Sequence, residues 1–510
     1  MLPQNPNLYQ INTRLWLTSL SDRIGRIATL DDIPDAALDR IASQGFDWIY
    51  LLGVWQTGTA GRQISLSHAK WRKEYQAVLP DLRDDDICGS CFAVTGYSVA
   101  ARFGGEATLA RLRARLQRRG LRLMLDFVPN HTAPDHPWVR QHPEYYVQGS
   151  RADLEREPET YALVSTDAGI LALAHGRDPY FPGWPDTLQL NFASQELQAN
   201  LIHVLVRMAS MCDGLRCDMA MLVLPKIFRR TWELEMQDFW PSAIPAVRQA
   251  NPGFVFMAEV YWDLEKDLLE QGFDFAYDKR LYDRLLAQDS ALVIEHLKTT
   301  ASFQAGLVRF LENHDEARSA AAFPWPVHQA AGIITYLSPG LRFFHQGQLQ
   351  GFRRKVSVHL CRGPEEQSDA VIENYYRSLL ACLTLPAVKT GECHLLLPSG
   401  AGQGMESWQN LIGLYWRANH YPSVLAVINY SSHQCQGYLA FPTQDVAAKQ
   451  IRLADQMHPI HSDYDGNQLI SPGLPPICPP GGIMYLYWKP ASDASSHTAG
   501  GHTMSGGQNG

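Results

Sequence analysis

The feature that most constrains the fold of this chain is the alternation of short apolar runs with longer amphipathic stretches through its first two-thirds. Stretches 107–119 and 196–211 have the spacing of amphipathic helices, and in 107–119 leucines recur at i, i+3 and i+4 with arginines on the other face. Alternating strands and helices are typical of α/β folds, and eight repeats favour a (β/α)8 TIM barrel over the alternative, a doubly wound open sheet. The eight expected strands are 10–17, 48–52, 121–127, 214–218, 254–260, 273–277, 307–311 and 341–345.

Other segments depart from this rhythm and suggest how the chain is divided. Residues 132–190 follow the third expected strand, are rich in Pro, Gly and Tyr, and are expected to form a short insertion in a catalytic barrel spanning 1–395. Residues 396–490 change to short strands with turn signals, which predicts a C-terminal antiparallel β-sandwich. The Ser-, Gly- and His-rich residues 491–510 are expected to be a disordered tail. The C-terminal strands are expected at 411–417, 424–430, 437–441, 451–454 and 483–489.

The composition excludes several classes of protein. Of the 510 residues, 45% are hydrophobic and 19% charged, so there is enough apolar surface to offset the ordering entropy, and extensive disorder is excluded. Lys+Arg number 44 and Asp+Glu 52, a net charge of −8, so nucleic acid is not an expected partner. No apolar run reaches about 18 residues, and no membrane span is expected. The oligomeric state stays open.

The N-terminal residues and the cysteines favour a cytoplasmic protein without metal or cofactor. No basic region followed by an apolar stretch and a cleavage site begins the chain, so a secretory signal is not expected. Nine scattered cysteines do not resemble a disulfide framework, and the spacing Cys88-Gly-Ser-Cys91 lacks a second pair at zinc spacing. Neither a Gly-x-x-x-x-Gly-Lys-Ser/Thr motif nor a His-Glu-x-x-His motif is present.

Polar residues stand at the carboxyl ends of four expected strands, where a buried strand would carry apolar side chains. In a barrel of parallel strands these ends meet at one mouth, so residues from distant parts of the sequence converge there. The intervals between the segments fit one or two strand–helix units each, with the first lengthened by the insertion. The segments are LDFVPNH (125–131), DGLRCD (213–218), MAEV (257–260) and FLENHD (310–315).

Three acidic residues in these segments, Asp218, Glu259 and Asp315, need a common explanation because like charges repel at close range. Glycosidic bond cleavage supplies one, since a retaining glycosidase holds a carboxylate nucleophile and a protonated carboxyl roughly 5 Å apart. Arg216 shares a strand face with Asp218 and can keep it ionised. Apolar neighbours should raise the pKa of Glu259. These environments favour Asp218 as the nucleophile and Glu259 as the acid/base.

Together the four segments resemble the four sequence regions of the α-amylase family of retaining glycosidases and transglycosidases. Residues 126–131 are similar to the first region and 214–218 to the second. Glu259 after an apolar strand resembles the third region, and 313–315 the fourth. The resemblance extends to the architecture over residues 1–490: barrel, insertion after the third strand, and C-terminal β-domain.

The resemblance implies a role for each matching residue. Asp218 would be the nucleophile, Glu259 the acid/base, and Asp315 the third carboxylate, which binds sugar hydroxyls and favours the distorted ring of the transition state. The implied substrate is an α-glucoside or α-glucan. The other implied roles are hydroxyl binding by His131 and His314, contact with the substrate site by Arg216, bracing of Arg216 by Asp126, and fixing of the loop after the third strand by Asn130.

The chain departs from the family pattern in several places. The usual tyrosine beneath the sugar ring is replaced by Phe92, so either Phe92 or Tyr97 is the expected platform. Many α-amylases follow the nucleophile with a Lys-His pair that contacts substrate and, in part, a structural calcium, whereas 219–222 read Met-Ala-Met-Leu. A calcium site therefore loses support, although Asn130 remains. The aromatic residues of 180–186 are expected either to line the cleft or to pack the insertion onto the barrel.

Several activities are compatible with these motifs. Water, a sugar hydroxyl or phosphate can attack the same covalent intermediate, so the motifs do not separate a hydrolase from a transglycosylase or a phosphorylase. A non-catalytic sugar-binding barrel is a further alternative, and loss of one carboxylate would be its signature. All three carboxylates are present. We therefore expect a retaining hydrolase of α-glucosidic bonds, with a transglycosylase or phosphorylase as the alternative.

Overall fold

Eight parallel strands close into a barrel, because β15 pairs with β1 as well as with β14. The computed structural model describes residues 4–400, 406–417, 421–447, 449–455, 461–474, 477–478 and 483–490. The predicted (β/α)8 class is confirmed, the open sheet is wrong, and the tail predicted at 491–510 lies outside the described residues. The barrel strands are β1 (Asn7–Asn12), β2 (Trp48–Leu52), β5 (Arg122–Phe127), β11 (Gly214–Cys217), β12 (Val255–Ala258), β13 (Phe275–Tyr277), β14 (Leu307–Phe310) and β15 (Leu341–His345).

The first strand differs from the prediction of 10–17. It is β1, and helix α1 (Thr13–Ile24) begins directly after it. The side chain of Asn12 accepts hydrogen bonds from the backbone N–H groups of Arg14 and Leu15, which caps the helix. The apolar run beyond residue 12 is therefore the buried face of a helix, on which Leu17 lies.

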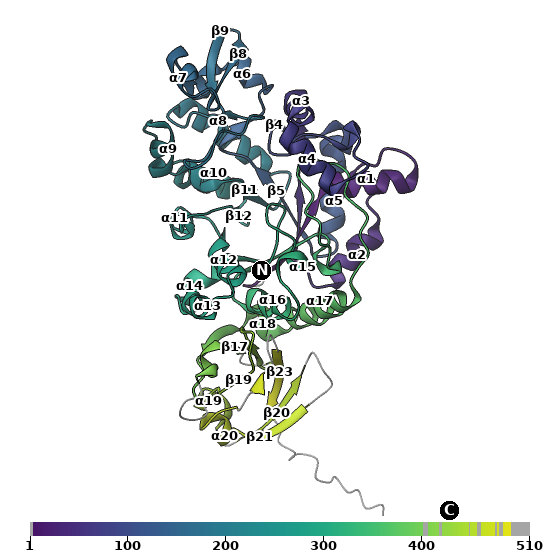
Figure 1. Cartoon of the computed structure of the whole chain (residues 1–510), viewed down its shortest axis with the longest axis vertical. Helices are drawn as coiled ribbons and strands as arrows, with labels where there is room; N and C mark the ends of the chain where they lie inside the picture. Colours follow the sequence, from purple (N-terminus) through teal and green to yellow (C-terminus); the bar gives the residue numbers. More distant parts are fainter. Residues whose placement is uncertain are drawn as a thin grey trace, which may run out of the picture.

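Helices follow the barrel strands and cover them (Figure 1). The two helices expected at 107–119 and 196–211 are α5 (Gly105–Gln117) and α8 (Gln195–Met208). Within the described ranges, no helix is long and apolar enough to cross a bilayer. The other principal helices of the barrel are α2 (Asp35–Ser43), α9 (Pro225–Trp232), α10 (Trp240–Ala250), α11 (Glu265–Glu270), α12 (Lys279–Leu286), α13 (Ser290–Leu297), α14 (Ala301–Ala305), α15 (Ser319–Ala322), α16 (Val327–Leu337), α17 (Ala370–Leu383) and α18 (Pro386–Thr390).

The segment after β5 forms a small β-rich unit above the barrel mouth. Its two ends pair through β6 (His131–Thr132) and β10 (Leu188–Gln189), which ties the start of the segment to its finish. Between them lies a three-stranded antiparallel sheet with the order β7-β9-β8. The remaining elements are α6 (Pro137–Gln141), β7 (Gln148–Gly149), α7 (Arg151–Arg156), β8 (Tyr161–Thr166) and β9 (Gly169–Ala174).

Two further segments, which the sequence did not single out, stand beside the mouth. The first is the α3–α4 hairpin, made of α3 (Thr59–Ser67), α4 (Ala69–Val78) and the loop that follows them to residue 87, and the second is residues 351–369, here called the strap. They are joined by an antiparallel bridge between Ile87 and Leu360 and by the ion pair of Arg362 with Asp86. A separate hydrophobic cluster lies between them, formed by the buried side chains of Tyr75, Leu79, Ile87 and Leu360.

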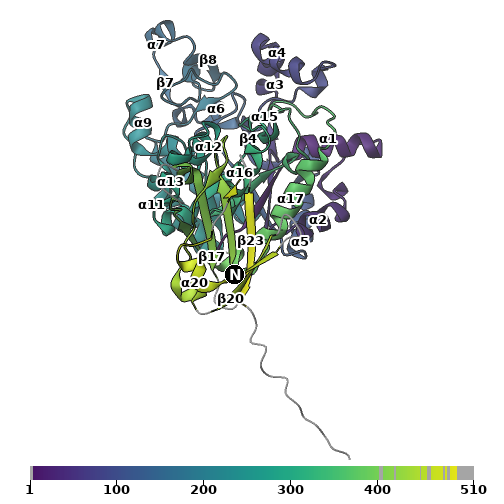
Figure 2. The ribbon, with the colours of Figure 1, turned by 60° about the horizontal axis from the view of Figure 1, so that its bottom comes forward.

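The C-terminal part is an antiparallel sheet packed below the barrel (Figures 1 and 2). One face of its central strands joins the barrel core through Trp416 and Ile428, and the other face forms its own cluster around Tyr415. The stretch 437–441, predicted to be a strand, forms only isolated bridges. The sheet already begins before residue 396. Its strands in order are β16 (Glu392–Leu396), β17 (Leu411–Arg417), β18 (Val424–Asn429), β23 (Ile483–Pro490), β20 (Gln450–Asp455) and β21 (His461–Asp465), beside a pair formed by β19 (Cys435–Gln436) and β22 (Ile477–Cys478).

Candidate active site

The carboxyl ends of β5, β11, β12 and β14 bring the expected acidic residues to one mouth of the barrel. Asp218 follows β11 directly, and Glu259 follows β12 directly. In the register of the sheet, Arg216 stands opposite Asp126 on one side and Met257 on the other. These three neighbouring strands therefore bring Asp126, Arg216 and Met257 close together near the mouth.

A fully buried arginine is the centre of this group of residues. Nη1 of Arg216 donates a 2.6 Å hydrogen bond to Oδ1 of Asp218, and Nη2 lies 2.7 Å from Oε2 of Glu259. The rings of Phe92 and Tyr277 lie 5.1 and 5.8 Å from its Cζ atom. One guanidinium therefore holds the two carboxyl groups as direct neighbours in a largely apolar surrounding.

Asp126 is anchored chiefly to the second barrel strand and not to Arg216. Its carboxylate accepts hydrogen bonds from the hydroxyl of Tyr50 and, at 3.0 Å, from the backbone N–H of Gly53. Its backbone oxygen accepts a 2.7 Å bond from Nε1 of Trp55. The bracing of Arg216 expected from the sequence is the longer contact of 3.9 Å to Nη1.

Glu259 makes contacts through both of its oxygens. Oε2 accepts a 2.7 Å hydrogen bond from the backbone N–H of Met219 and faces Arg216, while Oε1 accepts a 2.9 Å bond from the hydroxyl of Tyr261. Met219 adopts a left-handed backbone conformation with φ 42°, which is uncommon for a residue other than glycine. This turn immediately after Asp218 coincides with the donation of the Met219 N–H to Glu259.

The electrostatics of the two carboxyl groups differ from those of exposed acids. The exposed fractions of Asp218 and Glu259 are 5% and 3%. Burial raises the pKa of Glu259 to about 7 and that of Asp218 to about 6, although Arg216 pulls both pKa values down. The negative charge of Asp218 raises the pKa of Glu259 further. Glu259 thus holds a proton to higher pH than Asp218 does.

The third carboxylate differs because it is partly open. The side chain of Asp315 is 43% exposed, and its Oδ2 lies 2.9 Å from Nε2 of His314. Although partial burial opposes its ionisation, His314 holds the pKa of Asp315 well below its usual range. Nδ1 of His314 pairs in turn with the amide of Gln10 at 2.9 Å, so β1 fixes the imidazole. The charges of Asp218 and Glu259 both interact with that of Asp315.

The two aromatic candidates for a sugar platform lie in different surroundings. Phe92 packs against His314 with ring centroids 5.4 Å apart and against the guanidinium of Arg216. The hydroxyl of Tyr97 both donates to the backbone oxygen of Val128 and accepts from its N–H, each at 2.9 Å, and the residue is buried. The geometry therefore favours Phe92 over Tyr97 as the platform.

Asn130 and His131 lie where the inserted segment leaves the barrel. Nε2 of Gln189 donates to both the side-chain and the backbone oxygen of Asn130 at 3.0 Å. One side-chain amide therefore ties the start of the inserted segment to its end at Gln189. His131 packs against Trp184 with centroids 5.3 Å apart. Across the described ranges, no group of three or more His, Cys, Asp and Glu side chains could hold a metal ion.

Two residues that the sequence motifs do not indicate contact the predicted site. One is Tyr261, although its position two residues after Glu259 is a usable signal. The other is Lys355 of the strap, and its Nζ donates a hydrogen bond to the backbone oxygen of Asp315. No sequence signal placed Lys355 there, because it comes from an irregular segment after the last barrel strand.

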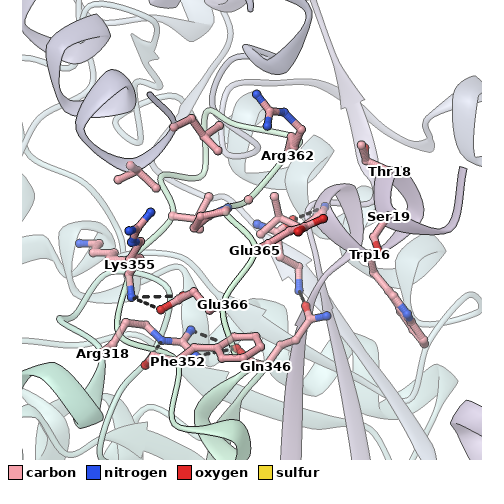
Figure 3. Close-up of a pocket in the computed structure, with 18 of the residues that line it drawn as sticks. Trp16, Thr18, Ser19, Arg318, Gln346, Phe352, Lys355, Arg362, Glu365 and Glu366 are labelled. Carbon is pink, nitrogen blue, oxygen red and sulfur yellow. Dashed lines mark hydrogen bonds between the residues drawn. The ribbon is translucent and has the colours of Figure 1, made fainter. Parts of the chain in front are cut away.

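Two cavities meet at His314 on the side of the site that the strap covers. The larger, of about 920 Å³, is lined by α1, the strap and the loops after β14 and β15. The smaller, of about 360 Å³, lies between α4 and the strap and is lined by Asp315 and Trp71. Lys355 lines both. In the larger cavity (Figure 3), Trp16, Thr18 and Ser19 of α1 lie on one side, and charged residues of the strap lie on the other.

Parts of the chain are similar in sequence to known proteins. Over 292 residues the chain is 23% identical to the "Alpha-amylase MalA" of Haloarcula japonica, covering 54% of this chain and 38% of that protein. It is 31% identical over 151 residues to an "Alpha-1,4-glucan:maltose-1-phosphate maltosyltransferase" of Burkholderia pseudomallei, covering 28% of this chain and 12% of that protein. The chain therefore spans well under half of these curated relatives.

Solved structures resemble the chain over nearly its whole length. The "noncanonic maltogenic alpha-amylase AmyB" of Thermotoga neapolitana superposes with a TM-score of 0.68 at 17% identity, covering 96% of this chain and 99% of that one. An α-amylase of Geobacillus thermoleovorans in complex with acarbose gives 0.65, also at 17% identity, over 96% and 99%. At these identities the likeness concerns the fold alone. The family model of the "Alpha amylase, catalytic domain" matches residues 93–374, more than half of the chain, and the chain therefore belongs to the α-amylase family.

Proposed function

We propose that the chain is a retaining enzyme that cleaves α-glucosidic bonds through a covalent glycosyl intermediate on Asp218, with Glu259 as the acid/base. The observation that carries this proposal is the shared guanidinium of Arg216, with Asp218 at 2.6 Å and Glu259 at 2.7 Å. Retaining enzymes hold their two carboxyl groups close together, whereas inverting enzymes leave room for a water molecule between sugar and base. Two carboxyls on one guanidinium support retention.

The roles follow from the environments of the two carboxyl groups. Asp218 Oδ attacks the anomeric carbon while Glu259 gives its proton to the departing oxygen, which takes the electron pair of the broken C–O bond. Arg216 favours the ionised form of Asp218, and burial keeps Glu259 protonated in the resting site. In the second step Glu259 takes a proton from the acceptor, whose oxygen then displaces Asp218.

The other site residues would hold the sugar unit that loses its bond. The exposed carboxylate of Asp315 lines the smaller cavity and can accept hydrogen bonds from sugar hydroxyls, while His314, which lines both cavities, orients that carboxylate and would meet a hydroxyl only if it gave up one of its two present partners. Phe92 offers an apolar ring between His314 and Arg216, which suits the face of a sugar. His131 lies beside Trp184.

The acceptor decides between hydrolysis, transfer and phosphorolysis, and hydrolysis is proposed first. Support for an α-glucan substrate comes from relatives named as α-amylases and as α-1,4-glucan:maltose-1-phosphate maltosyltransferases. A timed assay with malto-oligosaccharides, sucrose and trehalose, each with and without phosphate, separates the three activities by their products. Free glucose or maltose indicates hydrolysis, longer chains indicate transfer, and a sugar phosphate indicates phosphorolysis.

A cytoplasmic site of action is supported by the cysteines, all of which are free among the described residues.

The test of the proposed intermediate is covalent trapping with a 5-fluoro-α-glucosyl fluoride. The fluorine on the ring slows both the formation and the breakdown of the glycosyl-enzyme. The good leaving group restores the rate of formation, so the glycosyl-enzyme accumulates. Mass spectrometry of the digested protein is expected to find the sugar on the peptide that contains Asp218. A sugar on a peptide from elsewhere in the chain would contradict the assignment.

The pH dependence of kcat/KM is expected to be a narrow bell. The free enzyme needs Asp218 ionised and Glu259 protonated, so activity rises with the deprotonation of Asp218 and falls with that of Glu259. Burial raises the pKa of Asp218 to about 6 and of Glu259 to about 7, so both limbs lie above the ordinary range of carboxylic acids. The two apparent pKa values read from these limbs belong to the interacting pair of carboxyl groups and not to either residue alone. An acid limb near 4 together with an alkaline limb above 9 would contradict this environment.

A further inference from the structure

The acid/base Glu259 has a different set of partners at each of its two oxygens. Oε2 faces two groups that only donate, the backbone N–H of Met219 at 2.7 Å and the guanidinium of Arg216 at 2.7 Å. Oε1 faces the hydroxyl of Tyr261 at 2.9 Å. A hydroxyl can donate and, after rotation, accept a hydrogen bond. It is the only one of these partners that suits both the charged and the protonated form of Glu259.

This asymmetry determines where the proton can reside. A proton on Oε2 would point at the hydrogens of Met219 N–H and Arg216, which would cost both contacts. A proton on Oε1 meets no obligate donor, because the Tyr261 hydroxyl can turn its hydrogen away. The acidic proton of Glu259 is therefore confined to Oε1, beside Tyr261.

We propose that Tyr261 is a positioning residue of the acid/base, whose hydroxyl keeps the transferable proton on Oε1 of Glu259 and then stabilises the carboxylate left behind. This inference rests on the proposed function. When the Oε1–H bond breaks, the proton goes to the departing sugar oxygen, and the Tyr261 hydroxyl donates to Oε1. In the second step Oε1 takes the acceptor's proton, and the Tyr261 hydroxyl rotates back.

The surroundings keep the hydroxyl of Tyr261 protonated. Tyr261 is partly buried, and the pKa of its hydroxyl is raised well above its usual value by burial and by the charges of Glu259 and Asp315, so it does not ionise at working pH. The titratable and charged groups that face Glu259 are Arg216, Asp218, Asp315, Tyr261 and Tyr277. Tyr261 is the one that donates to Oε1.

Tyr261→Phe tests this role because it removes one oxygen and keeps the ring. Loss of a donor to the carboxylate raises the pKa of Glu259, and a hydrogen bond to a charged group corresponds to about one pH unit, so the alkaline limb of kcat/KM should move up by about that much. On a malto-oligosaccharide, kcat is expected to fall about tenfold with little change in KM, since Tyr261 contacts Glu259 and not the sugar. On α-glucosyl fluoride, which needs little acid help, kcat should fall less than twofold.

A matched control separates positioning from packing. Tyr430→Phe also removes a buried hydroxyl hydrogen bond, here a 2.6 Å bond to the backbone oxygen of Leu285 beneath the barrel. It should lower Tm without moving the pH limb. An unchanged limb in Tyr261→Phe, or an equal loss on both substrates, would overturn the proposal. Tyr261→Leu, which also lacks the hydroxyl, should reproduce the shift if Tyr261→Phe does not fold.

A readout without turnover distinguishes the failure of this inference from the failure of the proposed function. Infrared difference spectra against Glu259→Gln report the protonated carbonyl band of Glu259 as a function of pH. The band of the Tyr261→Phe protein should persist about one pH unit higher than that of the wild type. If the wild type turns over no α-glucoside, the proposed function is wrong. If the band titrates identically in both proteins, the role of Tyr261 is wrong.

Discussion

Asp218→Asn is expected to lower kcat on malto-oligosaccharides by about 10⁴-fold or more, because an amide does not form the glycosyl ester and loss of a nucleophile has effects of this size. The fold should persist, since the amide oxygen can still accept the 2.6 Å hydrogen bond from Arg216. The measurement is kcat on the purified variant together with Tm. Tm should stay equal or rise, because the substitution removes a charge that is 95% buried.

The matched control flanks the same strand at its other end. Asp213 stands just before the start of β11 and pairs with Arg113 at 2.6 Å, at the end of the barrel away from the mouth. Asp213→Asn should reduce stability and leave kcat within a few-fold of the wild type. Azide added to Asp218→Gly should yield β-glucosyl azide, because azide enters from the face that the nucleophile has vacated. α-Glucosyl azide from that variant, and the β-anomer from Glu259→Ala, would mean that the two roles are reversed.

Arg216→Met is expected to lower the free energy of unfolding by about 3–5 kcal/mol at neutral pH, since it leaves buried carboxylates without their cation. Activity should fall by about 10³-fold, because Asp218 then binds a proton more tightly and Glu259 loses its neighbour. The loss of stability should depend on pH. The folded-state pKa values of Asp218 and Glu259 already lie above the unfolded values, and without Arg216 they rise further.

The sign of that dependence follows from linkage. A carboxyl whose folded pKa is raised contributes stability below its unfolded pKa, and this contribution is lost as the pH rises through the folded pKa. The deficit of Arg216→Met should therefore be small near about pH 4 and large near about pH 8 in urea titrations. Arg309→Met removes another fully buried arginine, the partner of Asp278, and should destabilise without abolishing activity. A deficit of equal size at both pH values would contradict the view that Arg216 compensates these carboxylates.

The barrel could be predicted from the sequence because each strand is a short apolar run that ends in a change of polarity. Strands β2 and β15 begin and end at the predicted residues. The error at the first strand arose because apolar residues continue past Asn12 into α1, and periodicity alone does not separate a strand from the buried face of a helix over so short a run. The cap formed by Asn12 was the missing signal.

The site could be predicted in part, and the remainder depended on contacts with no local pattern. The shared position of Asp218 and Arg216 on one strand face follows from the two-residue alternation of β-structure. Tyr97, by contrast, was expected as a possible platform for the sugar ring. No sequence pattern indicates that its hydroxyl forms a hydrogen bond with the backbone of Val128. Lys355 reaches Asp315 from a segment without secondary structure, so neither period nor motif could place it.

The hydrophobic cluster between the strap and the α3–α4 hairpin has a consequence for how such an enzyme diversifies. Arg362 and Asp86, which hold the two segments together, are 276 positions apart in the chain. Shortening either segment alone would expose the apolar side of the other to water, because Tyr75 and Leu360 would lose their shared contacts. A change in the length of either segment is therefore expected to need a compensating change in the other, 276 positions away in the chain.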